Sequence, residues 1–170
     1  MAFPLEKHPW WNYIHEDLRE LLKQSTLLID IFEREVFPKY PDFHDYSFVA
    51  FPAAKAYEGF LKTLFKDLGF INEEDFYGKR FRIGKALNPE LEKVLRKEES
   101  VYDRIVSFCG GKDLANVLWE TWKRGRNSLF HWFPNEKNAI SFVEAKQTVE
   151  SIFEAMDLAF ESCKAPLPQR

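Results

Sequence analysis

The chain has 170 residues and a net charge of -3, with 45% hydrophobic and 30% charged residues. This composition excludes an intrinsically disordered protein, and the length fits one domain with a substantial core. The slightly acidic balance argues against a general nucleic-acid-binding protein unless basic residues gather locally.

Membrane association and metal binding are not expected from this sequence. No apolar stretch approaches the roughly 20 residues needed to cross a bilayer, and the N-terminus lacks the apolar segment of a signal peptide. The spacing of the histidines with the carboxylates fits no metal site, so we expect no metal and no cofactor. Cys109 and Cys163 also lack metal-ligand spacing. We expect both to be reduced in a cytoplasmic protein.

Apolar residues at helical spacing predict two long helices in the first half of the chain, over residues 14–36 and 47–68. Two prolines follow the first helix and end it. Ser47 is the expected N-cap of the second helix and Gly69 its C-terminal glycine, although Pro52 would also allow a start at Phe51. Gly59 in mid-helix indicates a close approach by another backbone.

Residues 70–89 break the helical period at several glycines and at Asn88-Pro89, which predicts a loop with, at most, short strands. Short helices are predicted over 89–98, 101–109 and 112–124. Ser100 and Asp103 form the expected capping box of the second of these, and Gly110-Gly111 are expected to end it.

A long last helix is predicted to begin after Ser141, which forms a capping box with Glu144. The predicted fold is an all-α bundle of three long and several short helices with one irregular insert near 70–89. We expect a single domain over 1–170, with a core over about 14–162 and a short flexible tail at 164–170.

Basic residues gather in two places. The first group comprises Lys79, Arg80, Arg82 and Lys85, and the second comprises Lys123, Arg124 and Arg126. Aromatic residues interleave with the first group. Cations beside aromatic rings suit single-stranded RNA, because phosphates attract cations and exposed bases stack on flat rings. The alternative is a solvated loop and a helix C-terminus, where cations are favoured in any case.

The segment "RNSLFH", residues 126–131, carries the most specific pattern in the chain. An Arg-Asn pair with a histidine four residues after the asparagine is expected by chance only about 0.01 times in a chain of this composition. The pattern resembles the hallmark of the HEPN superfamily of ribonucleases, an arginine and a polar residue followed by a histidine. "FPAAKAYEGFLKTLFKDLG" and "RIGKALNP" resemble the RNase LS-like HEPN branch of toxin–antitoxin and phage-defence proteins.

The resemblance covers about residues 14–162 and implies a metal-independent endoribonuclease that acts as a homodimer, with both motifs lining one cleft. Arg126 and His131 would be the catalytic pair and Asn127 their polar companion. A charged residue of the second helix would face the cleft, and the candidates are Lys55, Glu58 and Lys62. The expected partners are RNA, a second copy of the chain and a cognate antitoxin, with no specificity for DNA.

The side chains of this motif suit RNA cleavage through the 2′-hydroxyl of the substrate. Histidine exchanges protons near neutral pH, and the arginine fork matches a phosphate. Residues five apart on an α-helix are rotated by about 140°, so Arg126 and His131 would not share one helix face. Either the helix yields near Gly125, or the two residues meet across a dimer. The alternative function is a non-catalytic HEPN-like module that binds RNA, a nucleotide or a protein partner.

Overall fold

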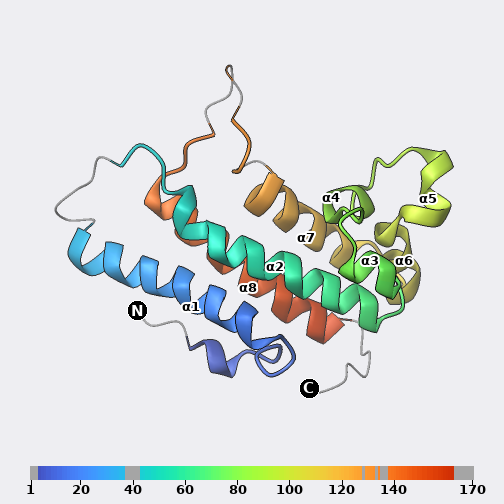
Figure 1. Ribbon diagram of the computed structural model, residues 1–170, viewed down its shortest axis with the longest axis horizontal. Coiled ribbons are helices and arrows are strands. Elements are labelled where there is room, and N and C mark those ends of the chain that lie inside the picture. The colour runs from blue at the N-terminus through green and yellow to red at the C-terminus, as the bar shows by residue number, and fades with distance from the viewer. Residues whose placement is uncertain (1–3, 37–42, 128, 133, 135–137, 163–170) are drawn as a thin grey trace.

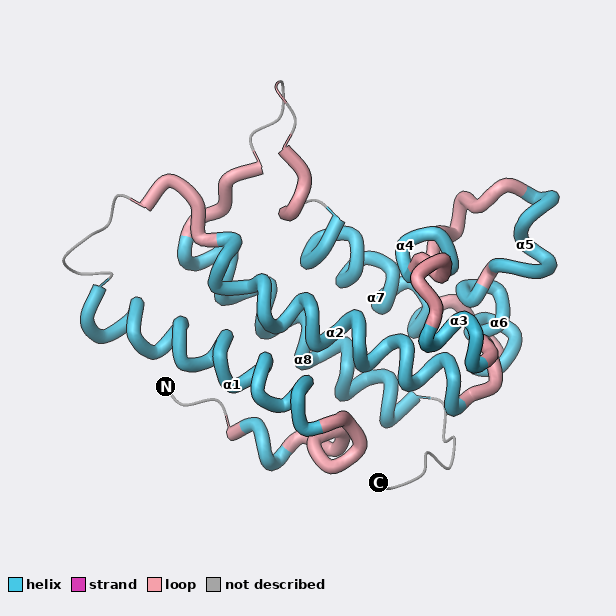
Figure 2. Tube along the Cα trace, viewed as in Figure 1, coloured by secondary structure: helices cyan, strands magenta, loops and turns pink. Residues whose placement is uncertain are grey.

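The structure, a computed structural model, describes residues 4–36, 43–127, 129–132, 134 and 138–162. Those residues form helices and loops and include no strand, so the predicted all-α class is confirmed (Figures 1 and 2). The helices are α1 (Glu16–Ile31), α2 (Ser47–Asp67), α3 (Glu73–Tyr77), α4 (Ile83–Ala86), α5 (Lys93–Glu99), α6 (Val101–Cys109), α7 (Asp113–Trp122) and α8 (Phe142–Ser162). A 3-10 turn, η1 (Leu5–Lys7), and two π-helical turns, η2 (Phe32–Val36) and η3 (Lys123–Asn127), complete them.

The three long helices, α1, α2 and α8, form the body of the molecule, with α2 packed against both of the others (Figure 1). The short helices α3 to α6 gather at the end where α2 finishes, and α7 returns along α8. The largest fully buried side chains include Trp10, Tyr57, Phe60, Phe65, Leu118 and Met156. The aromatic residues that the composition emphasised therefore contribute much of the core.

Helix α2 begins at Ser47, so neither a start at Phe51 nor Ser47 as N-cap is correct. Asp45 accepts hydrogen bonds from the Ser47 backbone N–H and hydroxyl instead. Pro52 lies inside the helix. Beside it, the buried Ser25 hydroxyl of α1 accepts from Ala53 N–H and donates to the Val49 carbonyl. A side chain inserted into the backbone ladder lets a helix tolerate a local distortion.

Several predicted helix ends are confirmed. Gly69, with φ 72°, follows α2, and Gly110, with φ 71°, follows α6, as a left-handed residue at C′ requires. Ser100 caps α6, and Ser141 and Glu144 form their reciprocal pair of hydrogen bonds before α8. Gly59 does face a close neighbour, but a Cβ there would meet the Leu18 side chain of α1 and not a backbone.

The insert at 70–89 contains the short helices α3 and α4, so the allowance for short strands was wrong. Gly84 of α4 lies against Trp122 at the end of α7, where an added Cβ would stand 2.8 Å from the indole Nε1. A glycine is therefore needed for α4 to reach α7.

The expectations about the two cysteines and the C-terminal tail meet different outcomes. Cys109 is disulfide-bonded, which corrects the expectation that it is reduced. Cys163 and the tail at 164–170 lie outside the described residues. Among the residues that the structure describes, no helix has the length and apolar character needed to span a membrane.

Candidate functional site

The segment that carries the RNSLFH motif changes conformation where α7 ends. After Trp122 the chain forms the π-helical turn η3, and residues 129–132 are non-helical. Gly125 is buried in this turn, and a Cβ added there would lie 3.4 Å from Thr148 and 3.6 Å from Ile152 of α8. π-Turns are rare and are frequent at functional sites. The helix therefore does yield around Gly125, one of the two geometries that the sequence left open.

Arg126, the last residue but one of η3, has two neighbours that fix its guanidinium. Its Nε lies 3.7 Å from Glu58 Oε2 of α2, and its Cζ lies 5.3 Å from the ring centre of Phe130. A ring beneath a guanidinium attracts it and restrains its plane. Of the three α2 candidates, the structure therefore brings Glu58 to Arg126.

The Arg126–Glu58 pair orients the guanidinium more than it stabilises the fold. Both side chains are about one-third exposed, at 37% and 36%, and such ion pairs contribute roughly 0–1 kcal/mol. The separation exceeds hydrogen-bond length, and the terminal nitrogens of Arg126 make no hydrogen bond within the described part of the chain. The fork of Arg126 is consequently open toward a ligand.

His131 is exposed and lies beyond the turn, in the connection between α7 and α8. Its backbone carbonyl accepts a hydrogen bond of 2.6 Å from the Asn138 side chain, which joins the two sides of the connection. Between the described side chains of Arg126 and His131 there is no hydrogen bond. The side chain of Asn127 lies outside the described residues.

One face of α2 lies beneath this site. Phe51, Lys55, Glu58 and Lys62 fall within an arc of about 60°, because an α-helix has 3.6 residues per turn. Phe51 contacts Phe130 edge to face, with ring centres 5.1 Å apart. Lys55 is exposed between Phe51 and Glu58, and Lys62 is half-buried one turn beyond Glu58. Sequence reasoning missed Phe51, although it shares the helical spacing of the three charged candidates.

Asp45 holds the far end of the same connection onto the start of α2. Its carboxylate accepts from the backbone N–H groups of Ile140 and Ser47 and from the Ser47 hydroxyl. Burial acts to raise the pKa of Asp45, but these hydrogen bonds outweigh it and the pKa is lowered from its usual 3.8. A lowered pKa means that the ionised carboxylate stabilises the fold above pH 3.8 and loses that effect as the pH falls through its folded pKa. Asp45 was not predicted from the sequence.

The two predicted basic groups stand in different surroundings. Arg80, Arg82 and Lys85 line an open pocket of about 480 Å³, which Asp75 and Glu98 also line. Lys85 is paired there with Glu99. The second group meets carboxylates as well, since Arg124 lines a separate pocket of about 440 Å³ together with Glu120 and Glu154.

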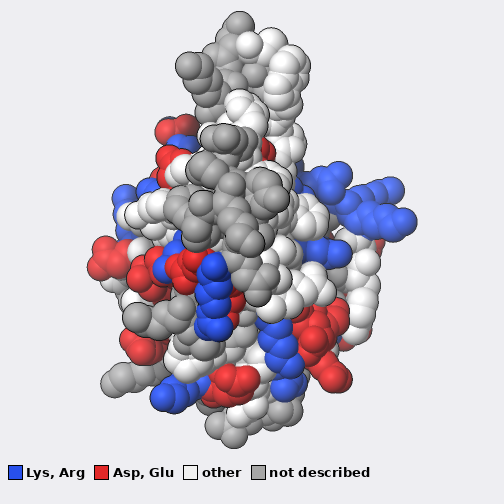
Figure 3. Space-filling view, turned by 90° about the vertical axis from the view of Figure 1, so that its left-hand side faces the viewer, with Lys and Arg blue, Asp and Glu red and all other residues white. Residues whose placement is uncertain are grey.

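Lys79 and Lys123 are exposed. Basic and acidic side chains are also intermixed on the face seen in Figure 3. Carboxylates also stand among the cations of both predicted groups, because each group lines a pocket together with Asp or Glu.

Within the part of the chain that the structure describes, no group of three or more His, Cys, Asp or Glu side chains is arranged to hold a metal ion. No protein-family model, curated protein or solved structure matches the chain.

Proposed function

We propose that the protein is a metal-independent endoribonuclease that cleaves single-stranded RNA, with Arg126 and His131 as its catalytic residues. The observation that carries the proposal is the arrangement of Arg126. Its guanidinium is held between Glu58 and the Phe130 ring, and its terminal nitrogens make no hydrogen bond in the described structure. A planar, permanently charged fork of this kind matches the oxygens of a phosphate.

The proposed reaction is an internal displacement at phosphorus. The 2′-hydroxyl of the RNA loses its proton to a base and attacks the adjacent phosphate, and the 5′-oxygen leaves with a proton from an acid. The products are a 2′,3′-cyclic phosphate and a 5′-hydroxyl. His131 is exposed, and histidine is the side chain that most often acts as a general base or acid. Arg126 stabilises the charge that develops on phosphorus, which is usually the largest single contribution to catalysis.

A homodimer is part of this proposal, with the motif of each copy facing a common cleft. In this proposal Arg126 of one copy and His131 of the other act on the same phosphate. A two-fold axis would form two equivalent sites in the cleft, and the His131 of each would accept the proton of the 2′-hydroxyl and give a proton to the 5′-oxygen. Lys55, Arg124 and the Arg80–Lys85 segment supply further cations for the RNA backbone.

The biological setting of the proposal rests on the resemblance of the RNSLFH segment to HEPN ribonucleases. We propose that the protein is the toxin or effector of a toxin–antitoxin or phage-defence system. Its partners there are RNA, a second copy of the chain and a cognate antitoxin.

The test is incubation of the protein with an unstructured RNA oligonucleotide in EDTA, followed by mapping of the product ends. We expect 2′,3′-cyclic phosphate and 5′-hydroxyl ends. His131→Ala and Arg126→Ala should each reduce the rate at least about a hundredfold, as expected for loss of a proton-transfer group or of a charge on the transition state. His44→Ala and Arg34→Ala are matched controls, since both residues are exposed and neither belongs to the site. Full activity of His131→Ala, or loss of cleavage in EDTA, contradicts the proposal.

A second candidate is a non-catalytic helical module that binds RNA, a nucleotide or a protein. The 480 Å³ pocket lined by Arg80, Arg82 and Arg104 favours it, because its size suits a small phosphorylated ligand. A purified protein that binds RNA without cutting it would support this candidate over the ribonuclease.

A further inference from the structure

An exposed aromatic ring lies directly beside the candidate catalytic arginine. Phe51 of α2 is 48% exposed, and its buried side meets Phe130 edge to face at 5.1 Å and 84°. The contact holds the ring in one orientation, while the rest of its surface faces solvent. Because the ring is already held in place, its side chain loses little conformational entropy when a ligand binds to it.

Two cations lie near this ring. Arg126 lies 5.3 Å above Phe130, so its guanidinium is at most about 10 Å from the centre of the Phe51 ring. Lys55 is exposed one helical turn after Phe51, about 6 Å farther along the axis. It makes no ion pair or hydrogen bond within the described structure.

We infer that Phe51 is a stacking platform for one nucleobase of a single-stranded RNA, whose neighbouring phosphates contact Lys55 and Arg126. The inference rests on the proposed function, because it assigns a binding position to the same substrate. Single strands bind proteins by this combination of aromatic stacking and adjacent cations. The distance of at most about 10 Å corresponds to roughly three steps of about 3.4 Å along a stacked strand. Every base has a π-face, so the platform accepts any of the four.

The charges of this surface separate a nucleic acid from an apolar partner. A second protein seated on Phe51 would have to cover Lys55 and the open fork of Arg126, which demands acidic groups at matching positions. Single-stranded RNA brings a negative charge beside every base. The pattern of one ring beside two cations therefore favours RNA as the occupant.

The experiment measures binding of a fluorescent 2′-O-methyl oligoadenylate, which lacks the attacking hydroxyl and therefore reports binding without cleavage. Phe51→Ala should weaken binding about tenfold, within the range found for loss of one base–aromatic stack. Phe51→Leu retains apolar contact with Phe130 but lacks a π-face, and it should weaken binding similarly. Phe51→Trp should bind as tightly as the original protein or more tightly.

Phe108→Ala is the matched control. Phe108 is 49% exposed on α6 and meets Phe70 edge to face with ring centres 5.7 Å apart. Phe108→Ala removes the same kind of half-exposed ring from a segment that is distant from Arg126 in the sequence. This variant should bind the oligonucleotide as tightly as the original protein.

A second arm moves one abasic position through the oligonucleotide. At the position that faces Phe51, the abasic strand should bind the original protein and Phe51→Ala equally well. If Phe51→Leu binds the oligonucleotide as tightly as the original protein, the inference is overturned. It is also overturned if Phe51→Ala changes the oligomeric state but not the affinity for the oligonucleotide.

These measurements distinguish failure of the proposed ribonuclease activity from failure of the proposed Phe51 platform. Absence of cleavage of unmodified RNA by the original protein overturns the ribonuclease, while Phe51-dependent binding of the uncleavable strand still supports the platform. If the protein cleaves and binds RNA, but neither activity changes when Phe51 is replaced, only the stacking platform is contradicted.

Discussion

Two short polar side chains, Ser25 and Asp45, hold the end of the bundle on which the candidate site stands. Ser25 is fully buried and joins α1 to the backbone of α2 beside Pro52. Asp45 joins the start of α2 to the connection that contains His131. Both act through backbone groups, so their effect depends on an oxygen at one position and not on side-chain volume.

Replacing Ser25 by alanine should destabilise the protein by about 1–3 kcal/mol. The change leaves the buried N–H of Ala53 and the carbonyl of Val49 without the hydroxyl that now pairs with both. Chemical denaturation with urea measures the free energy of unfolding directly. Ser107→Ala is the control, because Ser107 is exposed on α6 and should change stability by less than about 0.5 kcal/mol. Equal stability of the two variants would show that the backbone groups of Val49 and Ala53 do not need the Ser25 hydroxyl.

At the scale of elements, the short helix α4 is coupled to the turn that carries Arg126. It packs through Gly84 onto Trp122, the residue that ends α7 and precedes η3. Trp122 is 7% exposed, so its indole has little room to move. A change in α4 is therefore transmitted to the start of the motif through one rigid ring.

Gly84→Ala should destabilise the protein by about 1–3 kcal/mol, as overpacking in a filled interior does. The new Cβ would stand 2.8 Å from the Trp122 Nε1, and a buried ring cannot withdraw as the end of a flexible side chain can. Thermal unfolding monitored by tryptophan fluorescence gives the measurement. Gly111→Ala is matched, because its Cβ would meet nothing within 4 Å, and that variant should be as stable as the original or slightly more so. A Gly84 variant that unfolds at the same temperature as the Gly111 variant contradicts this packing.

Helix ends were easier to predict than what lies between the long helices. Gly69 and Gly110 end α2 and α6 as predicted, because a left-handed residue after a helix favours glycine wherever it occurs. The sequence allowed short strands at 70–89, but the segment forms α3 and α4. Contacts with α2 and α7 decide the conformation of so short a segment. Ser47 has the right residue type for a cap, but it is the first helical residue, and Asp45 accepts hydrogen bonds from its backbone N–H and hydroxyl.

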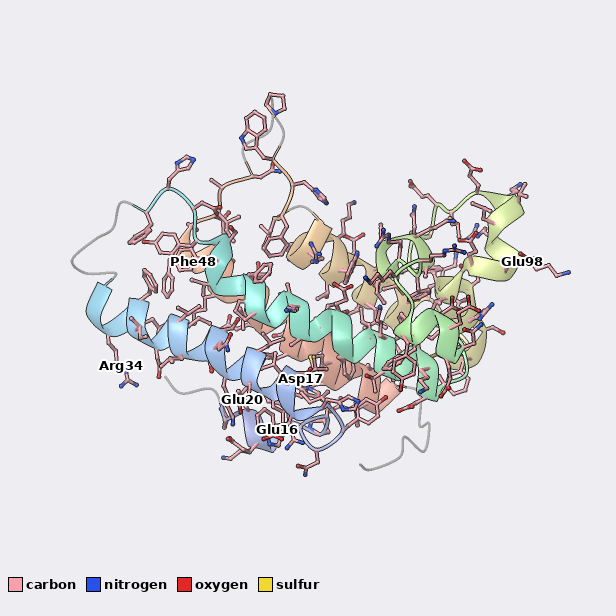
Figure 4. The ribbon with its side chains drawn as sticks, in the orientation of Figure 1. Glu16, Asp17, Glu20, Arg34, Phe48 and Glu98 are labelled. Carbon is pink, nitrogen blue, oxygen red and sulfur yellow. The ribbon has the colours of Figure 1, made fainter. Side chains whose placement is uncertain are left out.

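At the scale of the whole molecule, the candidate site stands over α2 between Phe51 and Glu58, and the pocket of Arg80 and Arg82 extends to Glu98 and Glu99 of α5. Figure 4 shows Phe48, near the start of α2, toward one end of the molecule and Glu98 at the opposite end. Because Gly84 of α4 packs onto Trp122, the basic segment and the motif are joined through α4 and α7.

Mixing two inactive variants tests whether the catalytic pair is shared between copies. In a dimer whose sites each take Arg126 from one chain and His131 from the other, an Arg126→Ala chain paired with a His131→Ala chain contains one intact site. Random exchange then restores roughly one quarter of the original activity, because half of the dimers are mixed and each has one of two sites. The measurement is the cleavage rate of RNA after the purified variants have been mixed and allowed to exchange. Each variant incubated alone is the control, and a mixture as inactive as its components places both residues in one chain.

The sequence by itself determined the helical class, the three long helices and most of their ends, because periodicity, caps and glycines act over only a few residues. It also singled out Arg126 and His131 by their pattern. Only the tertiary structure decided that Glu58, and not Lys55 or Lys62, meets Arg126, and that Phe51 and Phe130 form the ring pair beside it. All four α2 residues share one helix face, so the helical period cannot rank them. The choice depends on where the π-turn η3 sets Arg126 against α2, which is a contact between segments far apart in the chain.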